Sequence, residues 1–214
     1  MALSDEPVER PPVERRCRER RVADDDLYLV GTSEVPLIAM HLGEILEQLP
    51  LRYCAYSSCF RRESGSAGRD TRGMFRVHQF QKVEMVVYTH PDDSWDEHER
   101  MLAIEESLIQ ELGIPYRVVN TAAGDLSAAA AKRYDIEGWF PSQGRYRELT
   151  SCSNTTDYQA RRSRIRYRAG AKALETPHTL NGTAATDRWV LALLENFAGE
   201  IPEPLRTFGA PAHV

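Results

Sequence analysis

The sequence predicts an α+β fold in which helices flank an antiparallel sheet. Short apolar runs predominate in the middle of the chain and follow one another across glycine-containing turns, as in β-hairpins. Helical periodicity appears between these runs, most clearly over residues 94–113. A chain of 214 residues suits one domain with a substantial core.

The first 26 residues are predicted to form a charged, disordered tail. They contain six arginines and eight acidic residues but few large apolar side chains, so they cannot bury enough surface to offset the loss of chain entropy. We therefore expect two parts, a tail over residues 1–26 and a folded domain over residues 27–214.

The folded part is predicted to begin with a short buried strand and a helix. Residues 27–30 form an apolar run that Gly31 interrupts. Thr32 or Ser33 can then cap a helix, and Pro50 is expected to end it.

Two longer strands are predicted over residues 52–63 and 75–88, joined by a loop that contains three glycines together with Arg69 and Arg72. The remaining elements are predicted from helical periodicity, from short strand-like apolar runs, and from the glycines and prolines that interrupt them. They are, in chain order, a helix from Asp93 or Ser94 to Gly113, a strand at 114–119, a short helix at 125–131, strands at 136–139 and 146–151, a hairpin of 162–168 about Ala169–Gly170, and a buried helix at 189–197.

Composition excludes several classes of protein. The formal net charge of −5 argues against a generally basic nucleic-acid coat. The sequence has no run of about 18 apolar residues and no signal-peptide apolar region, so membrane and secretory fates are not expected. The cytoplasm is the expected location.

The four cysteines are predicted to be free. Cys17, Cys54, Cys59 and Cys152 form neither CxxC pairs nor a disulfide scaffold. Cys54 and Cys59 could hold zinc with His78, but the spacing matches no common site, so buried thiols are expected and zinc is not.

An arginine-rich segment follows in the last third of the chain. Its arginines alternate with Ile165 and Tyr167, which predicts one cationic face of a strand. That face either meets solvent or contacts RNA or phosphate, and these residues leave both interpretations open. The arginines are Arg162, Arg164, Arg166 and Arg168.

The run from Phe60 to Glu84 carries charge at every second position where a core strand would be apolar. A sheet accepts such a face only against water or a ligand. Arginine and glycine backbone suit a polyphosphate, because they supply bidentate cations and closely approaching amides. The two alternatives are a solvated edge and a nucleotide-binding surface, and the rest of the chain favours the second. The charged positions are Arg61 and Glu63 on the first strand and Arg76, His78, Lys82 and Glu84 on the second.

The same run resembles motif 2 of the class II aminoacyl-tRNA synthetases. Residues 29–34, 147–162 and 180–183 are similar to segments of seryl-tRNA synthetases, in the same order and spacing. The resemblance extends from Leu27 almost to the C-terminus and implies the class II catalytic domain. The implied activity is activation of serine by ATP to seryl-adenylate, with magnesium, and esterification of tRNA(Ser).

The resemblance implies roles for the motif 2 residues. Arg61 would contact the α-phosphate and Glu63 would help to seat the adenine amino group. Arg69 and Arg72 would meet the outer phosphates or the acceptor end of tRNA. The ATP-binding residues implied are Arg61, Arg62, Glu63, Glu148, Leu149, Thr150 and Ser151.

Two further groups follow from the resemblance. Glu148 and Ser151 would hold Mg²⁺ between phosphates, as a hard cation requires oxygen ligands. Arg188 would contact the γ-phosphate and act with Arg61 and Glu63 in catalysis. The segment from Asn181 to Arg188 is one residue shorter than the family spacing, which leaves the alignment of this arginine open.

The serine site implied contains two carboxylates and small hydroxyls. Glu84 and Glu34 could take the ammonium and the hydroxyl proton, and a site that bonds this hydroxyl rejects alanine strongly. Thr32 and Ser33 precede Glu34 in the same segment, and Thr183 adds a hydroxyl at the substrate end.

No segment resembles the coiled-coil arm or motif 1 of the family, so we expect an N-terminally truncated chain whose sheet is incomplete on that side. The uncovered interface predicts self-association or a partner chain. Three functions stay open: a serine–tRNA ligase, a paralogue that passes activated serine to a carrier protein or small amine, and a non-catalytic remnant that binds nucleotide, RNA or a partner synthetase.

Overall fold

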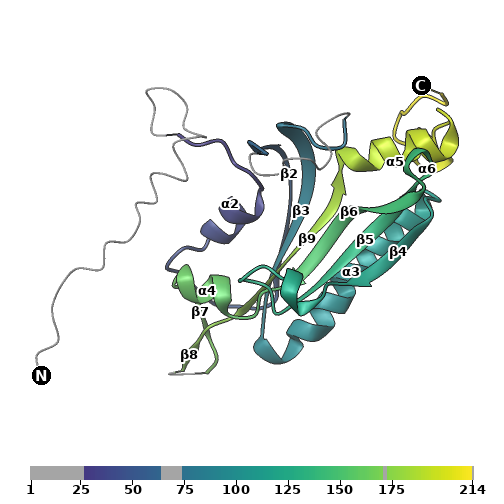
Figure 1. Cartoon of the computed structure of the whole chain (residues 1–214). Coiled ribbons are helices and arrows are strands. Elements are labelled where there is room, and N and C mark those ends of the chain that lie inside the picture. The colour runs from purple at the N-terminus through teal and green to yellow at the C-terminus, as the bar shows by residue number, and fades with distance from the viewer. Residues whose placement is uncertain (1–26, 64–73, 171–172, 214) are drawn as a thin grey trace, which may run out of the picture.

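A six-stranded sheet forms the centre of the fold (Figure 1). The computed structural model describes residues 27–63, 74–170 and 173–213, so the predicted tail, Arg69 and Arg72 lie outside the described residues. Every neighbouring pair of strands is antiparallel, which confirms the predicted class and sheet type. In spatial order the strands are β2 (Leu51–Phe60), β3 (Gln79–Thr89), β9 (His178–Thr186), β6 (Arg145–Asn154), β5 (Lys132–Phe140) and β4 (Tyr116–Asn120).

Helices and a small second sheet surround the strands. Among the described residues, no helix is both long enough and apolar enough to cross a membrane. The helices are α2 (Glu34–Ala39), α3 (Ser94–Glu111), α4 (Tyr158–Arg162), α5 (Asp187–Phe197) and α6 (Glu203–Arg206), with single 3₁₀ turns η1 (Pro91–Asp93), η2 (Ala123–Asp125) and η3 (Pro141–Gln143). The second sheet contains β1 (Ile45–Leu46), β7 (Arg166–Arg168) and β8 (Leu174–Glu175).

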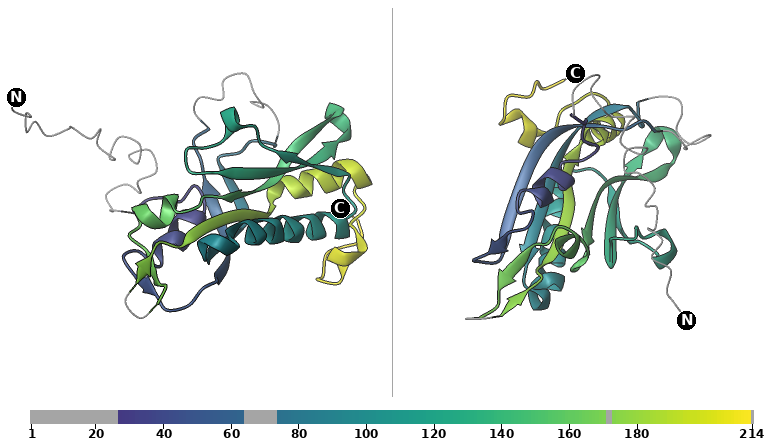
Figure 2. Two further views of the ribbon diagram at one scale, coloured as in Figure 1. Left: turned by 90° about the horizontal axis from the view of Figure 1, so that it is seen from below. Right: turned by 90° about the vertical axis from the view of Figure 1, so that its left-hand side faces the viewer.

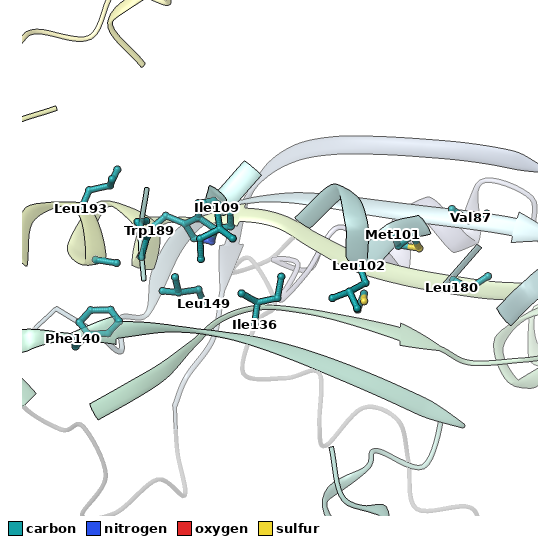
Figure 3. Packing of buried hydrophobic residues seen from close by; sticks show 13 residues of the cluster. Val87, Met101, Leu102, Ile109, Ile136, Phe140, Leu149, Leu180, Trp189 and Leu193 are labelled. Atoms are coloured by element: carbon teal, nitrogen blue, oxygen red, sulfur yellow. The ribbon is translucent and has the colours of Figure 1, made fainter. Parts of the chain in front are cut away.

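The larger core lies where α3 and α5 cover one face of the sheet (Figures 2 and 3). Helix α3 begins and ends as predicted, and Gly113 supplies the positive φ of 70° that turns the chain after it. The buried side chains of this core include Val87, Met101, Leu102, Ile109, Ile136, Phe140, Leu149, Leu180, Trp189 and Leu193.

A second core lies on the opposite face of β3. Successive strand residues point to opposite faces, so Val87 enters the first core, whereas Val86 and Tyr88 enter the second with α2 and α4. Lys82 and Glu84 precede Val86 on this same face. The second core therefore continues along β3 into a polar region, which is the floor of the cavity described below.

The N-terminal predictions need correction. Residues 27–30 are exposed rather than a buried strand, and the predicted long helix shortens to α2, with Leu46 in β1 instead. Gly43 has a φ of 77° and its amide donates to Ser163 O, so pairing with the α4 segment replaces the helix. The exposed side chains include Leu27, Val35 and Met40. The expected self-association stays a prediction.

Other local predictions also failed. Residues 125–131 contain no α-helix, and the predicted cationic strand is divided because Arg162 ends α4 and Arg164 has a φ of 55°. Only Arg166 and Arg168 lie on a strand, where β7 pairs with β8 as a hairpin. Cys54 is exposed on edge strand β2 rather than buried, whereas Cys59 and Cys152 are buried as expected.

Two β-bulges change which side chains share a face. Between Ile136 and Glu137 the register of β5 against β6 shifts, so β6 has one extra residue at Leu149. The extra residue places Glu148 and Ser151, three apart in sequence, on one face. A second shift beside Val83 and Glu84 leaves an extra residue, Ala184, on β9.

Gly182 allows the close approach of α3 to strands β6 and β9. A Cβ added there would lie 2.7 Å from Glu105 Oε1 and 2.8 Å from Met101 Cε, both of which are fully buried. We expect Gly182→Ala to lower the free energy of unfolding by about 1–3 kcal/mol, because the added methyl overpacks a closed core. Urea unfolding measures this change. Gly124→Ala, whose Cβ meets nothing within 4 Å, is the control, and equal effects of the two substitutions would contradict the explanation.

Candidate functional site

A cavity of about 300 Å³ opens on the face of the sheet that carries Lys82 and Glu84. Ser33 and Arg62 are absent from its wall; Ser33 is buried and Arg62 is exposed. The structure brings eleven of the thirteen predicted site residues together in that wall, namely Thr32, Glu34, Arg61, Glu63, Glu84, Glu148, Leu149, Thr150, Ser151, Thr183 and Arg188.

One end of the cavity contains a buried ion pair. Lys82 Nζ lies 2.6 Å from Glu84 Oε2 and donates to Thr32 Oγ1 at 2.6 Å, while Thr183 Oγ1 donates to Glu84 Oε2 at 3.1 Å. Burial raises the pKa of the Glu84 carboxyl, and the Lys82 ammonium opposes that effect. Thr183 faces Glu84 because the two residues are directly paired across β9 and β3.

Glu34 is held by amides rather than by a cation. Its Oε1 accepts hydrogen bonds from Gln159 Nε2 at 2.5 Å and from Asn181 Nδ2 at 2.9 Å. Neutral donors satisfy an oxygen without neutralising the carboxylate charge. The two carboxylates at this end therefore differ, because Glu84 has a lysine partner and Glu34 has two amide partners.

A second group in the cavity wall, called here the arginine end, consists of arginines that lie over two aromatic rings. The guanidinium of Arg188 lies 4.6 Å from the ring centroid of Phe75, and that of Arg61 lies 5.1 Å from the ring of Phe80. Burial lowers the pKa of Arg188, Glu148 opposes that effect, and the charges of nearby arginines, including Arg76, lower it further. Such a cluster of cations suits a polyphosphate.

The position of Arg188 follows from the start of α5. Thr186 caps this helix, its side chain accepting from Arg188 N at 3.3 Å, and Arg188 Nη1 donates to Glu148 O at 3.1 Å. The preceding carboxylate, Asp187, accepts the amide of Gln81 at 2.8 Å. The bulge at Ala184 lets Thr183 and Thr186 face the same cavity, so the short spacing before Arg188 still brings the arginine to its wall.

The predicted strand over residues 52–63 is too long at its end, because β2 ends at Phe60 and Glu63, with a φ of 55°, lies beyond it. The Glu63 carboxylate forms an ion pair with Arg76 from the other side of the loop. The predicted face shared by Arg61 and Glu63 is therefore not a strand face. Both residues line the cavity even so.

Glu148 and Ser151 supply oxygen ligands of the kind that Mg²⁺ prefers. The bulge at Leu149 puts both in the cavity wall, where Arg133 Nη2 donates to Glu148 Oε1 at 2.7 Å. The described residues contain no cluster of three His, Cys, Asp or Glu side chains with the geometry of a metal site. A carboxylate and a hydroxyl fit a magnesium ion that takes its other ligands from phosphates and water.

A buried carboxyl, Glu105 of α3, lies behind the cavity. Thr150 Oγ1 donates to its Oε2 at 3.2 Å, and its Oε1 has no partner among the described residues. Burial raises the pKa of Glu105 well above its ordinary value, because a low-dielectric surrounding disfavours the charged carboxylate.

We expect Glu105→Gln to stabilise the protein at about pH 8 but not at about pH 4. In the acid range both states hold the proton. As pH rises, the unfolded chain releases the proton at its ordinary pKa while the folded chain retains it, so the free energy of unfolding falls. Thermal unfolding across this pH range measures the difference. Glu111→Gln, exposed at the end of the same helix, is the control, and a pH-independent effect of Glu105→Gln would contradict the assignment.

Several residues of the site were not identified from the sequence. Phe75, Arg133, Asn181 and Gln159 contact the predicted site residues, and Glu105 contacts one from behind. A partial signal existed for Asn181 and Gln159, because both lie in segments singled out by resemblance. Glu105 lies within an ordinary amphipathic helix, and no local sequence pattern distinguishes it from the other glutamates of that helix.

Comparisons with known proteins agree with this architecture. A family model described as the tRNA synthetase class II core domain (G, H, P, S and T) matches residues 16–197. The serine–tRNA ligase of Thermobifida fusca (strain YX) is 58% identical over 191 residues, covering 86% of this chain and 45% of that protein.

Two solved structures are similar to this chain. The seryl-tRNA synthetase from Pyrococcus horikoshii, complexed with ATP, has a TM-score of 0.84 at 51% identity, covering 88% of this chain and 44% of that chain. The cytoplasmic serine–tRNA ligase from Naegleria fowleri, in complex with AMP, has a TM-score of 0.84 at 42% identity. The match covers 91% of this chain and 48% of that chain.

The chain spans about half the length of the curated relatives that it matches, 45% of the Thermobifida protein. The family match includes every residue of the cavity wall, since these lie between Thr32 and Arg188. This chain therefore belongs to the family of class II tRNA synthetase core domains, and the relatives described above are serine–tRNA ligases.

Proposed function

We propose that this chain activates serine with ATP to form seryl-adenylate and pyrophosphate, and that it transfers serine to tRNA(Ser). The observation that carries the proposal is the division of one cavity into a carboxylate end and an arginine end. Amino-acid activation requires both ends, because an ammonium and a polyphosphate must be held next to each other. The ATP and AMP complexes of the two structural relatives support a nucleotide at this site.

At the carboxylate end, Glu34 is the proposed partner of the serine ammonium. Its charge is not neutralised by any described cation, whereas the charge of Glu84 is balanced by Lys82. Glu84 and Thr183 are the proposed partners of the serine hydroxyl. Alanine has no hydroxyl, so its binding would leave these two buried groups without a hydrogen-bond partner. We therefore expect kcat/KM for alanine to be lower than that for serine by a factor of about 10⁴.

At the arginine end, Arg61 and Arg188 are the proposed contacts of the triphosphate. A serine carboxylate oxygen attacks the α-phosphorus, and the bond to the β-phosphate breaks, so pyrophosphate leaves with the bonding electrons. Arg61 stabilises the charge that develops on the α-phosphate. Magnesium held at Glu148 and Ser151 would add further neutralisation of the phosphates.

Serine-dependent exchange of labelled pyrophosphate into ATP tests the activation step. We expect exchange with serine and none above background with alanine. Aminoacylation of tRNA(Ser) transcript then tests the transfer step. Exchange without charging of tRNA would support an acceptor such as a carrier protein or small amine, and ATP binding without exchange would support a non-catalytic remnant.

A further inference from the structure

The amide of Gln159 connects three segments that are distant in the sequence. Gln159 lies on α4, and its Nε2 donates to Glu34 of α2 at 2.5 Å, across 125 positions. At the other end of the amide, Oε1 accepts from Thr179 Oγ1 of β9 at 3.0 Å and lies 3.2 Å from Thr155 Oγ1. Thr155 and Thr179 are both buried.

The hydrogen-bond donors fix the orientation of this amide. A carboxylate can only accept, so Nε2 must face Glu34 and Oε1 must face the hydroxyls. Thr155 Oγ1 also donates to Thr179 O at 2.7 Å and lies 2.7 Å from Thr179 Oγ1, so the two hydroxyls and the Gln159 carbonyl oxygen form one hydrogen-bonded group. Rotating the amide by half a turn would bring its carbonyl oxygen against the carboxylate.

The arrangement holds one oxygen of Glu34 and leaves the other available. Gln159 and Asn181 both donate to Oε1, and within the described ranges no donor contacts Oε2. The charged groups that face this carboxylate are Glu84 and Lys82 of β3, which pair with each other. The two arginines of α4 are engaged elsewhere, since Arg161 pairs with Asp157 and Arg162 lies over the Tyr158 ring.

We infer that Gln159 is a positioning residue that orients Glu34 toward the amino-acid substrate, so that α4 helps to select for a substrate ammonium. This inference rests on the proposed function, because Glu34 is the proposed ammonium partner. Gln159 does not touch the substrate and acts through Glu34. A glutamine suits this position because it supplies a donor but no positive charge, which leaves the carboxylate charge for the substrate.

Two substitutions test the role. Gln159→Met keeps the length of the side chain but removes its donor, and we expect the KM for serine to rise about tenfold while the KM for ATP changes by less than about twofold. Gln159→Glu places a second carboxyl against Glu34. While the two carboxyls share one proton at about pH 6, that proton replaces the amide donor to Glu34 and serine should bind almost normally. Once the proton is released, by about pH 8, Glu34 has no donor at this position and the two carboxylates repel each other, so Glu34 turns from its binding orientation and the KM for serine should rise.

Two controls match these changes. Gln110→Glu makes the same substitution on the exposed surface of α3, and Arg161→Gln perturbs α4 outside the cavity wall. Neither should change the KM for serine. Equal losses for serine and ATP in Gln159→Met, or a pH-independent loss in Gln159→Glu, would show that Gln159 only maintains the fold and would overturn the inference.

Carbon-13 NMR of the side-chain carboxyls gives a readout that does not depend on activity. In Gln159→Glu, we expect positions 34 and 159 to titrate as a coupled pair, with one step above the ordinary range of glutamate. Independent titration at ordinary values would overturn the contact itself. If the pair is coupled in Gln159→Glu but the parental chain shows no serine-dependent exchange, the contact is supported and the proposed function is rejected. The failure of the inference and the failure of the proposed function are therefore distinguishable.

Discussion

Arg61→Ala is expected to lower serine-dependent pyrophosphate exchange by about two to three powers of ten, as for loss of one preorganised donor at a developing charge. The Arg61 guanidinium is already held in the cavity, because its Nε donates to Gly31 O at 3.1 Å and its Cζ lies 5.1 Å from the centroid of the Phe80 ring. The Arg61 side chain therefore does not have to be ordered when negative charge develops on the α-phosphate. Exchange rates at saturating serine and ATP measure the loss.

Arg61→Lys should recover little of this activity, because lysine cannot supply the planar, bidentate geometry. Arg100→Ala removes an arginine from the exposed surface of α3 and should exchange at the parental rate. Parental activity in Arg61→Ala would show that the arginine end of the cavity does not act on the α-phosphate.

Glu84→Gln is expected to weaken serine binding far more than ATP binding and also to destabilise the fold. The substitution removes the partner of Lys82, whose side chain is only 8% exposed, and a buried charge left unpaired costs about 3–5 kcal/mol. Glu84→Gln therefore lowers the stability of the fold although it preserves the shape of the side chain. The KM for each substrate and the melting temperature should be measured together.

A double variant separates recognition from stability. Lys82→Met with Glu84→Gln removes both buried charges, so the melting temperature should recover toward the parental value. Serine recognition should not recover, because the proposed hydroxyl acceptor is still altered. Recovery of serine affinity along with stability would show that Glu84 matters only as the partner of Lys82.

Local patterns predicted the elements that are held by local periodicity. Helix α3 carries apolar residues at helical spacing and ends before a glycine, and it begins and ends within one or two residues of the prediction. The predicted strands at 52–63 and 75–88 correspond in their central parts to β2 and β3, but β3 begins at Gln79, so Arg76 and His78 precede the strand on which they were predicted to lie. Each of these features depends on residues close in the chain, which is why the sequence alone was sufficient.

Strand β9 was missed for a physical reason. It contains Asn181 and Gly182, which have low strand propensity, yet it lies in the interior of the sheet between β3 and β6. Its polar side chains are tolerated because Asn181 donates to Glu34 and Thr183 donates to Glu84, its partner on β3. Tertiary contacts here outweigh local preference.

The sequence by itself determined the chemical groups of the site and their order along the chain, because resemblance to a family preserves residue types at fixed spacing. Only the tertiary structure decided how these groups are paired. The bulge at Leu149 brings Glu148 and Ser151 to one face, Lys82 balances Glu84, and Gln159 bonds Glu34 across 125 positions. A bulge is a mismatch between two strands, and a hydrogen bond between distant segments exists only after the chain has folded. Neither the bulge nor the hydrogen bond can therefore be predicted from a single stretch of sequence.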